Sequence, residues 1–444
     1  MKITERISYM PNEYSTQEAW KLLIDELNIK HEIEKKNFVK VSAKKIKEYK
    51  EPRVMCKWDS SYQRPKILRE NNISILPISR REYVLGNFDL YCKFPELDKE
   101  IATKIKVPHF ESINTDTISS EAKAISVMNL SGILEDFLNV KDNFSTFAGK
   151  MGVGKFNFDV KLKNSKKKIN IQVDKSICEI DAGYENDDSI VIVEAKNVVN
   201  SDFHVRQLYY PYRLWDTIVS KPIRLVFAVY TNKIFRLYEY RFKDIQDISS
   251  IELVKYKLYS IDSTDIQMDE IKAIHEKTKV ETDDNMSHFT KSNKVPFIQA
   301  DSFDKVISLI ENLYDNPMNK FEVAEEVLNL DPRQSDYYFN AARYIGLLKK
   351  NSKGEMILTP LCEKMMKMSY KQRVVIMLQQ IFKHKIFYES FEQYINTDNL
   401  PSQLEIIEKM RDYNVCSEKV INRRSKSVIS WLNWIIDLPK ITSK

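Results

Sequence analysis

The sequence predicts an α+β fold of α/β-like character, in which helices flank a central mixed sheet. Six strand-like runs lie between residues 156 and 242: FNFDVKL, INIQV, ICEIDAGY, SIVIVEAK, IRLVFAVY and IFRLYEYRF. One helical segment, residues 203–219, falls between the fourth and fifth runs, and a helix with one apolar side is expected over 118–139. Strands interrupted by helices favour a sheet with helices packed on it. From about residue 301 to the end the chain reads as helical.

Length and composition limit the class of protein. The 444 residues allow roughly two to four domains. No apolar run approaches the roughly 18 residues that span a membrane, and the first ten residues lack the apolar core of a signal peptide. We therefore expect a cytoplasmic protein with no membrane partner. Five widely spaced cysteines without a CxxC pair argue against a structural zinc site.

Changes in character along the chain divide it into five segments. We expect a mixed N-terminal region (1–112), a sheet-containing domain (113–261), a polar linker (262–300), a small helical domain (301–362) and a C-terminal helical region (363–444). Ser15 and Glu18 form a capping box that should open a first helix. The segment GKMGVGK (149–155) fits the spacing of a phosphate-binding loop, but Phe156 follows where Ser or Thr is needed. We interpret it as a glycine turn near a ligand.

Two carboxylates and a lysine stand at the ends of two neighbouring strand-like runs. Glu194 and Lys196 end the run SIVIVEAK, and residues i and i+2 of a strand point to the same face. Asp181 ends the run ICEI and is joined to the next run by the turn-rich YENDDS, so a hairpin would bring it beside Glu194. Two carboxylates suit Mg²⁺, which uses one or two of them together with waters and phosphate. Lys196 would orient or help deprotonate a water and offset charge on phosphorus. The alternative is a structural Glu–Lys pair.

The stretch EIDAGYENDDSIVIVEAKN resembles the core of PD-(D/E)xK restriction endonucleases. The resemblance maps the family's first acid onto Asp181, its second onto Glu194 and its lysine onto Lys196, with Ile180 in place of the proline. It implies a central mixed sheet flanked by helices and Mg²⁺-dependent phosphodiester hydrolysis, over roughly residues 115–245. It also suggests a further acid before the sheet, for which Glu135 fits, and a polar residue on the following helix, for which Gln207 fits. Each could instead be an incidental helix residue, and His204 is expected to pack or face solvent.

Residues 303–359 resemble a winged helix-turn-helix. FDKVISLIENLY and FEVAEEVLNL would be the first two helices, and Asp331 and Pro332 would open the third, with Tyr338, Ala341, Ala342 and Ile345 inward. GLLKKNSKGEMILTP would form the wing. A recognition helix reads base edges from the major groove, and wing lysines contact phosphates. The expected DNA-binding residues are Arg333, Gln334, Tyr337, Asn340, Arg343, Lys349, Lys350 and Lys353. A protein-binding winged helix is the alternative.

Two other segments carry basic residues. Arg423 and Arg424 precede the amphipathic helix of the C-terminal region and are expected to bind DNA, or else to be solvated while Trp431 and Trp434 pack in the core. Residues 51–83 are similar in overall character to the region ahead of the nuclease core in some type II restriction enzymes. There the candidate DNA contacts are Arg53, Lys57, Arg64, Lys66, Arg80 and Arg81.

The leading hypothesis is a type II restriction endonuclease that cuts double-stranded DNA at a specific sequence. One set of catalytic residues per chain and a two-fold DNA site imply a homodimer. A cognate DNA methyltransferase is expected as a separate protein. Two alternatives stay open: a methylation-dependent DNA endonuclease, and a DNA-binding regulator with an inactive nuclease fold.

Overall fold

A mixed sheet of eight strands organises the part of the chain that the structure describes. The computed structural model describes residues 14–95, 101–107, 110–113, 115, 118–281, 295–314, 316–328 and 332–443. The sheet has the order β17-β5-β14-β13-β12-β10-β9-β6. Its strands are β5 (Ile101–Lys104), β6 (Phe144–Gly152), β9 (Ile177–Glu185), β10 (Ile190–Lys196), β12 (Ile223–Thr231), β13 (Ile234–Phe242), β14 (Ile251–Ser260) and β17 (Thr442–Ser443). The α+β class with a mixed sheet is therefore confirmed.

Strand β10 lies inside the sheet and is covered on both faces, as its apolar run predicted. It pairs antiparallel with β9 and parallel with β12, and the connection to β12 carries β11 (Asp202–His204) and α8 (Arg206–Trp215). Helices α6 (Glu121–Leu130) and α7 (Ile133–Leu138) pack on one face against Val191 and Val193. Helix α8 packs on the other face against Ile192. The expected single helix over 118–139 is thus two helices, because Gly132 adopts a positive φ of 69° between them.

The N-terminal residues fold on their own core, Trp20 and Leu85 among its buried members. The capping box of Ser15 and Glu18 starts α1 as predicted. The elements are α1 (Thr16–Glu26), α2 (Ile29–Lys36), β1 (Phe38–Ser42), α3 (Ala43–Lys47), α4 (Pro52–Cys56), η1 (Ser61–Gln63), α5 (Lys66–Glu70), β2 (Ser74–Pro77) and β3 (Glu82–Gly86). The following strand β4 (Tyr91–Lys93) pairs with β11, and β5 joins the main sheet. The N-terminal unit therefore ends near residue 86, earlier than the boundary expected at residue 112.

The C-terminal half forms one helical unit. The expected order of three helices and a hairpin is present as α10 (Phe303–Leu313), α11 (Lys320–Glu322) with the π-helical turn η4 (Val323–Val327), α12 (Pro332–Tyr344), β15 (Leu348–Lys350) and β16 (Met356–Leu358). Asp331, the expected cap of the third helix, lies outside the described residues. Helices α13 (Pro360–Met366), α14 (Tyr370–Phe382), α15 (Lys385–Thr397), α16 (Gln403–Asp412) and α17 (Glu418–Asp437) follow, and then η5 (Leu438–Lys440). A continuous core joins both expected segments, with Trp431 buried in it.

The segment expected to be a linker is partly folded. Helix α9 (Met268–Lys277) packs against α14, and Ile266, Phe297 and Ile298 belong to the helical core. Most of the polar stretch ETDDNMSHFTKSNK, residues 282–294, lies outside the described residues. A few apolar residues thus pack this segment against the helical unit, although they are widely spaced in the sequence.

Two of the expected strands form a separate hairpin rather than part of the main sheet. Strands β7 (Lys155–Lys161) and β8 (Lys168–Asp174) pair with each other, and η2 (Ile248–Ser250) lies against them. The segment GKMGVGK spans the end of β6, a turn and the start of β7, so no helix follows it. A phosphate-binding loop that opens a helix is therefore excluded here, and the glycine-turn interpretation stands.

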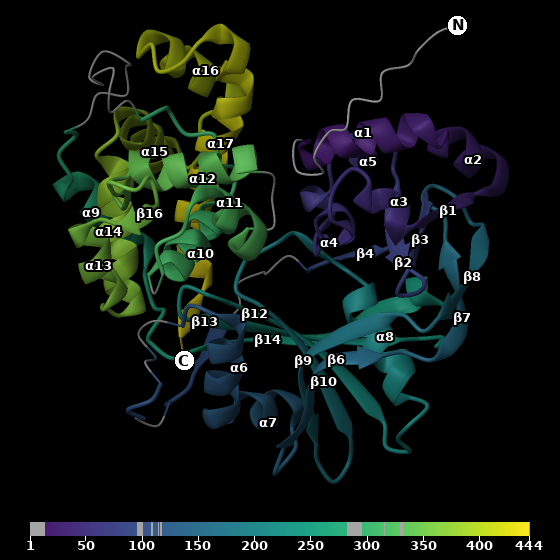
Figure 1. Cartoon of the computed structure of the whole chain (residues 1–444). Helices are drawn as coiled ribbons and strands as arrows, with labels where there is room; N and C mark the ends of the chain where they lie inside the picture. Colours follow the sequence, from purple (N-terminus) through teal and green to yellow (C-terminus); the bar gives the residue numbers. More distant parts are fainter. Residues whose placement is uncertain are drawn as a thin grey trace, which may run out of the picture.

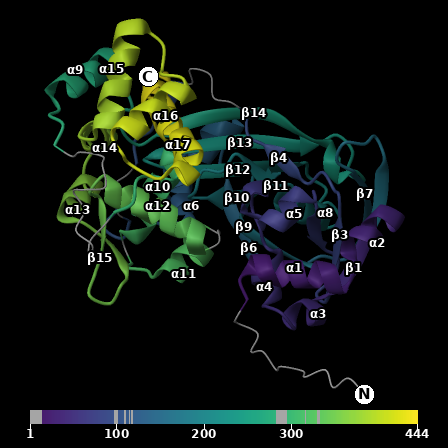
Figure 2. The same cartoon turned by 90° about the horizontal axis from the view of Figure 1, so that it is seen from above.

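The three parts are arranged around one region of the sheet. In Figure 1 the N-terminal helices (purple) and the C-terminal helices (green to yellow) stand on the same side of the sheet, whereas α6 and α7 lie on the other. In the view from above, β9 and β10 lie between the two helical groups (Figure 2). Residues at the ends of these strands can therefore contact both groups.

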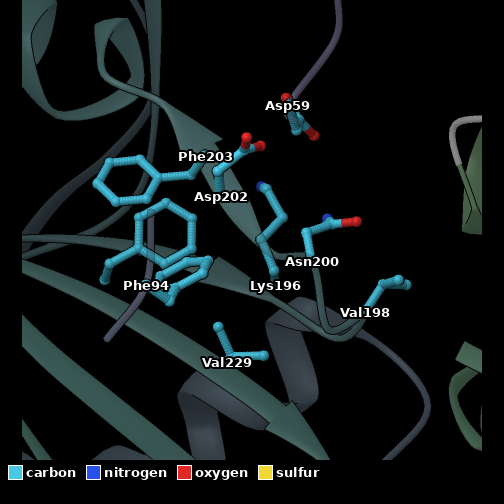
Figure 3. Close-up of a pocket in the computed structure, with 9 residues that line it drawn as sticks. Asp59, Phe94, Lys196, Val198, Asn200, Asp202, Phe203 and Val229 are labelled. Carbon is cyan, nitrogen blue, oxygen red and sulfur yellow. The ribbon is translucent and has the colours of Figure 1, made fainter. Parts of the chain in front are cut away.

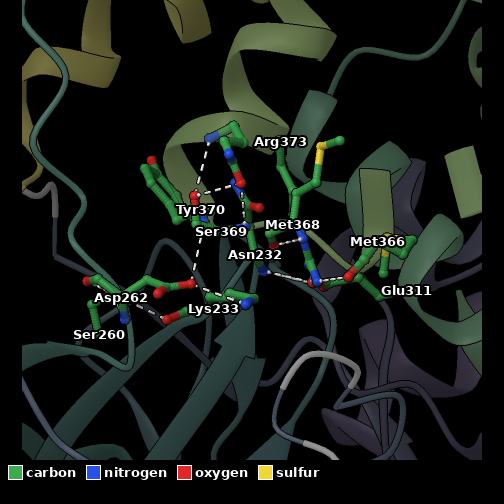
Figure 4. A network of polar contacts seen from close by, with 11 residues as sticks. Asn232, Lys233, Ser260, Asp262, Glu311, Met366, Met368, Ser369, Tyr370 and Arg373 are labelled. Carbon is green, nitrogen blue, oxygen red and sulfur yellow. Dashed lines mark hydrogen bonds and ion pairs between the residues drawn. The ribbon is translucent and has the colours of Figure 1, made fainter. Parts of the chain in front are cut away.

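Buried polar contacts fasten the helical unit to the sheet (Figure 4). Glu311 of α10 accepts hydrogen bonds from the backbone nitrogen of Asn232, at 3.0 and 3.1 Å, and from Thr231 Oγ1 at 3.2 Å. Arg373 of α14 approaches the same carboxylate at 3.5 Å. The turn between β12 and β13 is thus held by two helices of the C-terminal unit.

None of the helices in the described ranges combines the length and apolar character that crossing a membrane requires.

Candidate active site

The hairpin of β9 and β10 brings Asp181 and Glu194 to neighbouring strands. The last pair of its ladder is Val193 with Ala182, so Asp181 lies at the next position, opposite Glu194. The pairing of β6 with β9 advances from Phe147–Gly183 to Gly149–Ile180, which places an extra residue of β9 at the Asp181–Ala182 step. This bulge turns the Asp181 side chain onto the β10 backbone, where Oδ2 accepts from Ala195 N at 2.8 Å.

Lys196 lies among several carboxylates. Its Nζ is 2.8 Å from Glu194 Oε1, 3.5 Å from Glu121 Oε1 and 4.0 Å from Asp181 Oδ2. Its side chain retains 13% exposure, which leaves a path to solvent or substrate. Burial by itself would lower the pKa of Lys196, but the carboxylates of Glu194, Glu121, Asp59 and Asp181 raise it well above its ordinary value. The ammonium group is therefore charged at neutral pH.

Glu194 is 6% exposed and is shared between two donors. Gln207 Nε2 of α8 lies 2.5 Å from Glu194 Oε1, the same oxygen that Lys196 contacts. Burial raises the pKa of Glu194 to about 8, with Asp181 adding to the shift and Lys196 opposing it. A carboxylate in this position is stabilised by additional positive charge. This contact places Gln207 beside Glu194, on the helix where the resemblance suggested a polar residue.

The N-terminal region supplies Asp59 to the same place. Gln207 Nε2 also donates to Asp59 Oδ1 at 3.2 Å, and Figure 3 shows the Asp59 carboxylate facing Lys196 across a small hollow that Phe94 and Asn200 help to line. The Asp59 carbonyl accepts from His204 N at 2.8 Å. The segment is held further by Asp202, which accepts from Ser60 Oγ and Ser61 N. Residues far apart in sequence thus meet at the end of β10.

Glu135 does not join this group. It lies on α7, where its carboxylate faces Asp142 and Tyr184, and burial raises its pKa. The acid that the helices before the sheet bring to Lys196 is Glu121, in the first turn of α6. Glu121 and Glu135 do not share one helix face, because the chain breaks at Gly132 between α6 and α7. Ser120, the N-cap of α6, was the available sequence signal for a helix start beside Glu121.

Asp59 could not be found from the sequence. It lies outside any strand or helix, and no spacing relates it to Asp181 or Glu194. Its place depends on the packing of the N-terminal region onto β11.

The chemistry of this donor set fits a hard divalent cation. Asp181 and Glu194 offer oxygens side by side, and Gln207 Oε1 is buried without a hydrogen-bond partner. No group of three or more His, Cys, Asp or Glu side chains converges as metal ligands within the described ranges. Two carboxylates nonetheless agree with the usual Mg²⁺ site, in which waters and substrate phosphate complete the coordination.

The two ends of α12, the helix expected to read DNA, differ in their contacts. At one end Arg333 is exposed, Gln334 is half-buried, and Arg423 of α17 stacks on the ring of Tyr337 at 4.9 Å. At the other end Arg343 donates to Asn340 Oδ1 at 3.1 Å. The four residues expected to face inward, Tyr338, Ala341, Ala342 and Ile345, are all buried.

The wing and the basic pair of α17 differ in exposure. Lys349, Lys350 and Lys353 are exposed on or beside the β15–β16 hairpin. Arg424 is half-buried, burial lowers its pKa, and its Nε has no hydrogen-bond partner, so it is not a freely solvated cation. In the N-terminal region Arg64 is also buried, where it donates to the Ile73 carbonyl at 2.7 Å. Its expected surface role therefore does not fit.

Helix α10 of the C-terminal helical unit lies directly beside the candidate site. Asn197, one residue beyond Lys196, donates through Nδ2 to Asn312 Oδ1 of α10 at 2.8 Å. Gln63 of the N-terminal region donates to the Leu328 carbonyl at 3.1 Å. All three parts of the chain therefore meet around Lys196.

Comparison with known proteins divides the chain at similar places. Three family models match, each described as a domain of unknown function: DUF6996 over residues 17–85, DUF6997 over 86–260 and DUF7226 over 305–440. No curated protein and no solved structure matches the chain. The first two models meet at residue 86, between the N-terminal unit and the strands that join the sheet. The third spans both the segment expected to be a winged helix and the helices after it.

Proposed function

We propose that this protein is a metal-dependent DNA endonuclease. Within that class we propose a type II restriction endonuclease of the PD-(D/E)xK kind, which hydrolyses double-stranded DNA at a specific sequence. One observation carries the proposal: a half-buried Lys196 lies within 4.0 Å of both Asp181 and Glu194 at the ends of paired strands. A merely structural Glu–Lys pair would not need a second carboxylate, a bulge at that carboxylate and an amide that donates to the same Glu194 oxygen as the lysine.

The chain's own residues can perform distinct parts of the reaction. Asp181 and Glu194 would hold Mg²⁺, and Gln207 orients Glu194 through its 2.5 Å contact. Lys196 is charged, so it donates to the attacking water or to a phosphate oxygen rather than removing a proton. From the sequence, Lys196 was expected either to orient the water or to help deprotonate it, and a charged lysine favours the first role. Glu121 and Asp59 keep the lysine charged and aimed at the hollow.

Mg²⁺, when bound, would supply Lewis-acid stabilisation of the charge that develops on the phosphate. Burial of Glu194 supports this assignment, because a desolvated carboxylate gains from a nearby divalent charge more than a solvated one does.

Recognition of a specific sequence is supported by the exposed Arg333 and the half-buried Asn340 of α12 and by the lysines beside this helix. Arg333 and Asn340 are of the types that read guanine and adenine edges, and Lys349, Lys350 and Lys353 would contact phosphates. We further propose a homodimer, a cytoplasmic location and a separate cognate methyltransferase. These follow from the restriction-enzyme hypothesis, since a palindromic site is cut on both strands and host DNA must be protected.

The test is digestion of a large phage DNA, methylated and unmethylated, with Mg²⁺ and with EDTA. Wild-type protein should cut the unmethylated DNA into discrete fragments with Mg²⁺ alone. Lys196→Met should reduce the rate by at least about 100-fold, the effect of losing one electrostatic donor, without weakening DNA binding. Lys141→Met, at an exposed lysine outside the site, is the matched control.

Each other outcome is decisive. Cleavage of the methylated DNA alone would favour a methylation-dependent endonuclease. DNA binding by wild-type protein without cleavage under any divalent metal would favour a DNA-binding regulator. An undiminished rate in Lys196→Met would refute the assigned site.

A further inference from the structure

A second hollow with a different character lies away from the candidate active site. Three turns line it: residues 79–81 between β2 and β3, residues 152–154 between β6 and β7, and residues 174–175 between β8 and β9. Its volume is about 600 Å³ and it is open to solvent. We call it the basic groove. The N-terminal region and the sheet-containing domain each contribute part of it.

The groove carries unpaired positive charge. Arg80, Arg81 and Lys175 are exposed, and within the described ranges none of the three forms an ion pair with a carboxylate. The acidic lining residue Asp174 is engaged by Lys155 at 3.5 Å. The groove therefore attracts an anion.

The backbone of the groove is shaped for close approach. A Cβ atom added at Gly154 would meet nothing within 4 Å, so the turn of residues 152–154 leaves its surface open. Lys175 holds a positive φ of 58°, a conformation that glycine or asparagine adopts at lower cost. The conformation of this turn does not favour lysine, so the positive charge of Lys175 better explains its presence there.

The lining also indicates the kind of anion. No aromatic side chain lines the groove, so nothing is present there to stack a nucleotide base. The cations come from turns on two parts of the chain and face an open channel rather than an enclosed pocket. This arrangement suits a phosphate backbone that passes through rather than a small phosphorylated molecule.

We propose that the basic groove binds the phosphate backbone of duplex DNA flanking the scissile bond. This inference rests on the proposed function. Ile177, the first residue of β9, lies four residues before Asp181, which corresponds to about 13 Å at roughly 3.3 Å per residue. Lys175 precedes Ile177 by two residues, in the turn before the strand. Phosphates of one strand recur every 3.4 Å or so along the duplex axis. The groove therefore meets the backbone a few nucleotides from the cut.

The test compares two charge-matched triple variants. One is Arg80→Ala/Arg81→Ala/Lys175→Asn, in which asparagine tolerates the positive φ. The control is Lys30→Ala/Lys161→Ala/Lys166→Ala, at three exposed lysines that do not line the groove. Affinity for a long fluorescent duplex is measured by anisotropy against salt concentration in EDTA, so that no cleavage occurs. Thermal unfolding of each variant confirms that the fold is retained.

The groove variant should reduce the slope of log affinity against log salt by about three, since each phosphate contact contributes roughly 0.9. The control should keep the wild-type slope. On a duplex truncated short of the groove, wild type and groove variant should bind alike. An equal slope in groove variant and control on the long duplex would overturn the inference, even where wild-type protein still cuts phage DNA. If wild-type protein binds duplex DNA but leaves phage DNA uncut, the proposed endonuclease function is wrong. The salt dependence of duplex binding still tests the groove in that case.

Discussion

Replacement of Glu311 tests how the helical unit is attached to the sheet. Glu311 is 5% exposed and joins α10 to the β12–β13 turn and to Arg373 of α14 (Figure 4). Glu311→Ala removes the acceptor of the Asn232 N–H group and leaves the Arg373 guanidinium, itself 1% exposed, without its nearby carboxylate.

The expected loss follows from the burial of both partners. Burial raises the pKa of Glu311, while Arg373 and the backbone N–H group of Asn232 oppose the shift, so desolvation is the larger effect. Removing one member of a buried pair costs about 3–5 kcal/mol, because the other charge stays buried and uncompensated. We expect Glu311→Ala to lower the free energy of unfolding of the helical unit by this amount. The double variant Glu311→Ala/Arg373→Met should cost less than the sum of the single variants Glu311→Ala and Arg373→Met.

Urea denaturation monitored by tryptophan fluorescence and by far-ultraviolet circular dichroism measures the effect. Trp431 reports on the helical unit, since it is buried in that core. A loss below about 1 kcal/mol for Glu311→Ala, which is the range of a surface pair, would refute the reasoning. A double variant as unstable as the sum of the two single variants would refute the coupling between Glu311 and Arg373.

Two further predictions concern the candidate site and its surroundings. Asp59→Asn removes a carboxylate that faces Lys196, and it should lower either the apparent Mg²⁺ affinity or the cleavage rate by about 10–100-fold, measured by metal titration, with metal-free duplex binding unchanged. If both the apparent Mg²⁺ affinity and the cleavage rate are unchanged, Asp59 has no part in the site. Burial lowers the pKa of His204 to about 3 from an ordinary 6.5, so the unfolded chain binds a proton where the folded chain does not. Stability should therefore fall by about 1.4 kcal/mol per pH unit as pH drops below 6.5, and this slope should be absent in His204→Gln, measured by urea unfolding at several pH values.

Local patterns predicted much of the sheet and the placement of the candidate residues Glu194 and Lys196. The apolar run that ends in Glu194 and Lys196 forms the doubly covered strand β10, because four consecutive β-favouring residues suit a strand covered on both faces. The spacing of two places both side chains on one face, and the YENDDS turn brings β9 alongside as expected. Gln207 is also beside Glu194 as predicted, since α8 follows β10 closely in the chain.

Longer-range expectations were less accurate. Glu135 is not with the candidate site, since a single glycine conformation at Gly132 turned one expected helix into two. The expected linker contributes to the helical core, because packing can recruit a few apolar residues that show no strong periodicity. Arg64 and Arg424 are buried or half-buried, a property that neither their charge nor their sequence neighbours reveal.

The sequence by itself determined the elements that depend on neighbours a few residues apart: the strand that carries Glu194 and Lys196, the hairpin that adds Asp181, and the helices with a single apolar side. Only the tertiary structure decided that Asp59 and Glu121 surround Lys196, and that three turns from two regions gather Arg80, Arg81 and Lys175 into one groove. The physical reason is range. Backbone hydrogen bonding and side-chain alternation act along the chain, whereas burial and electrostatic proximity depend on which distant surfaces pack together.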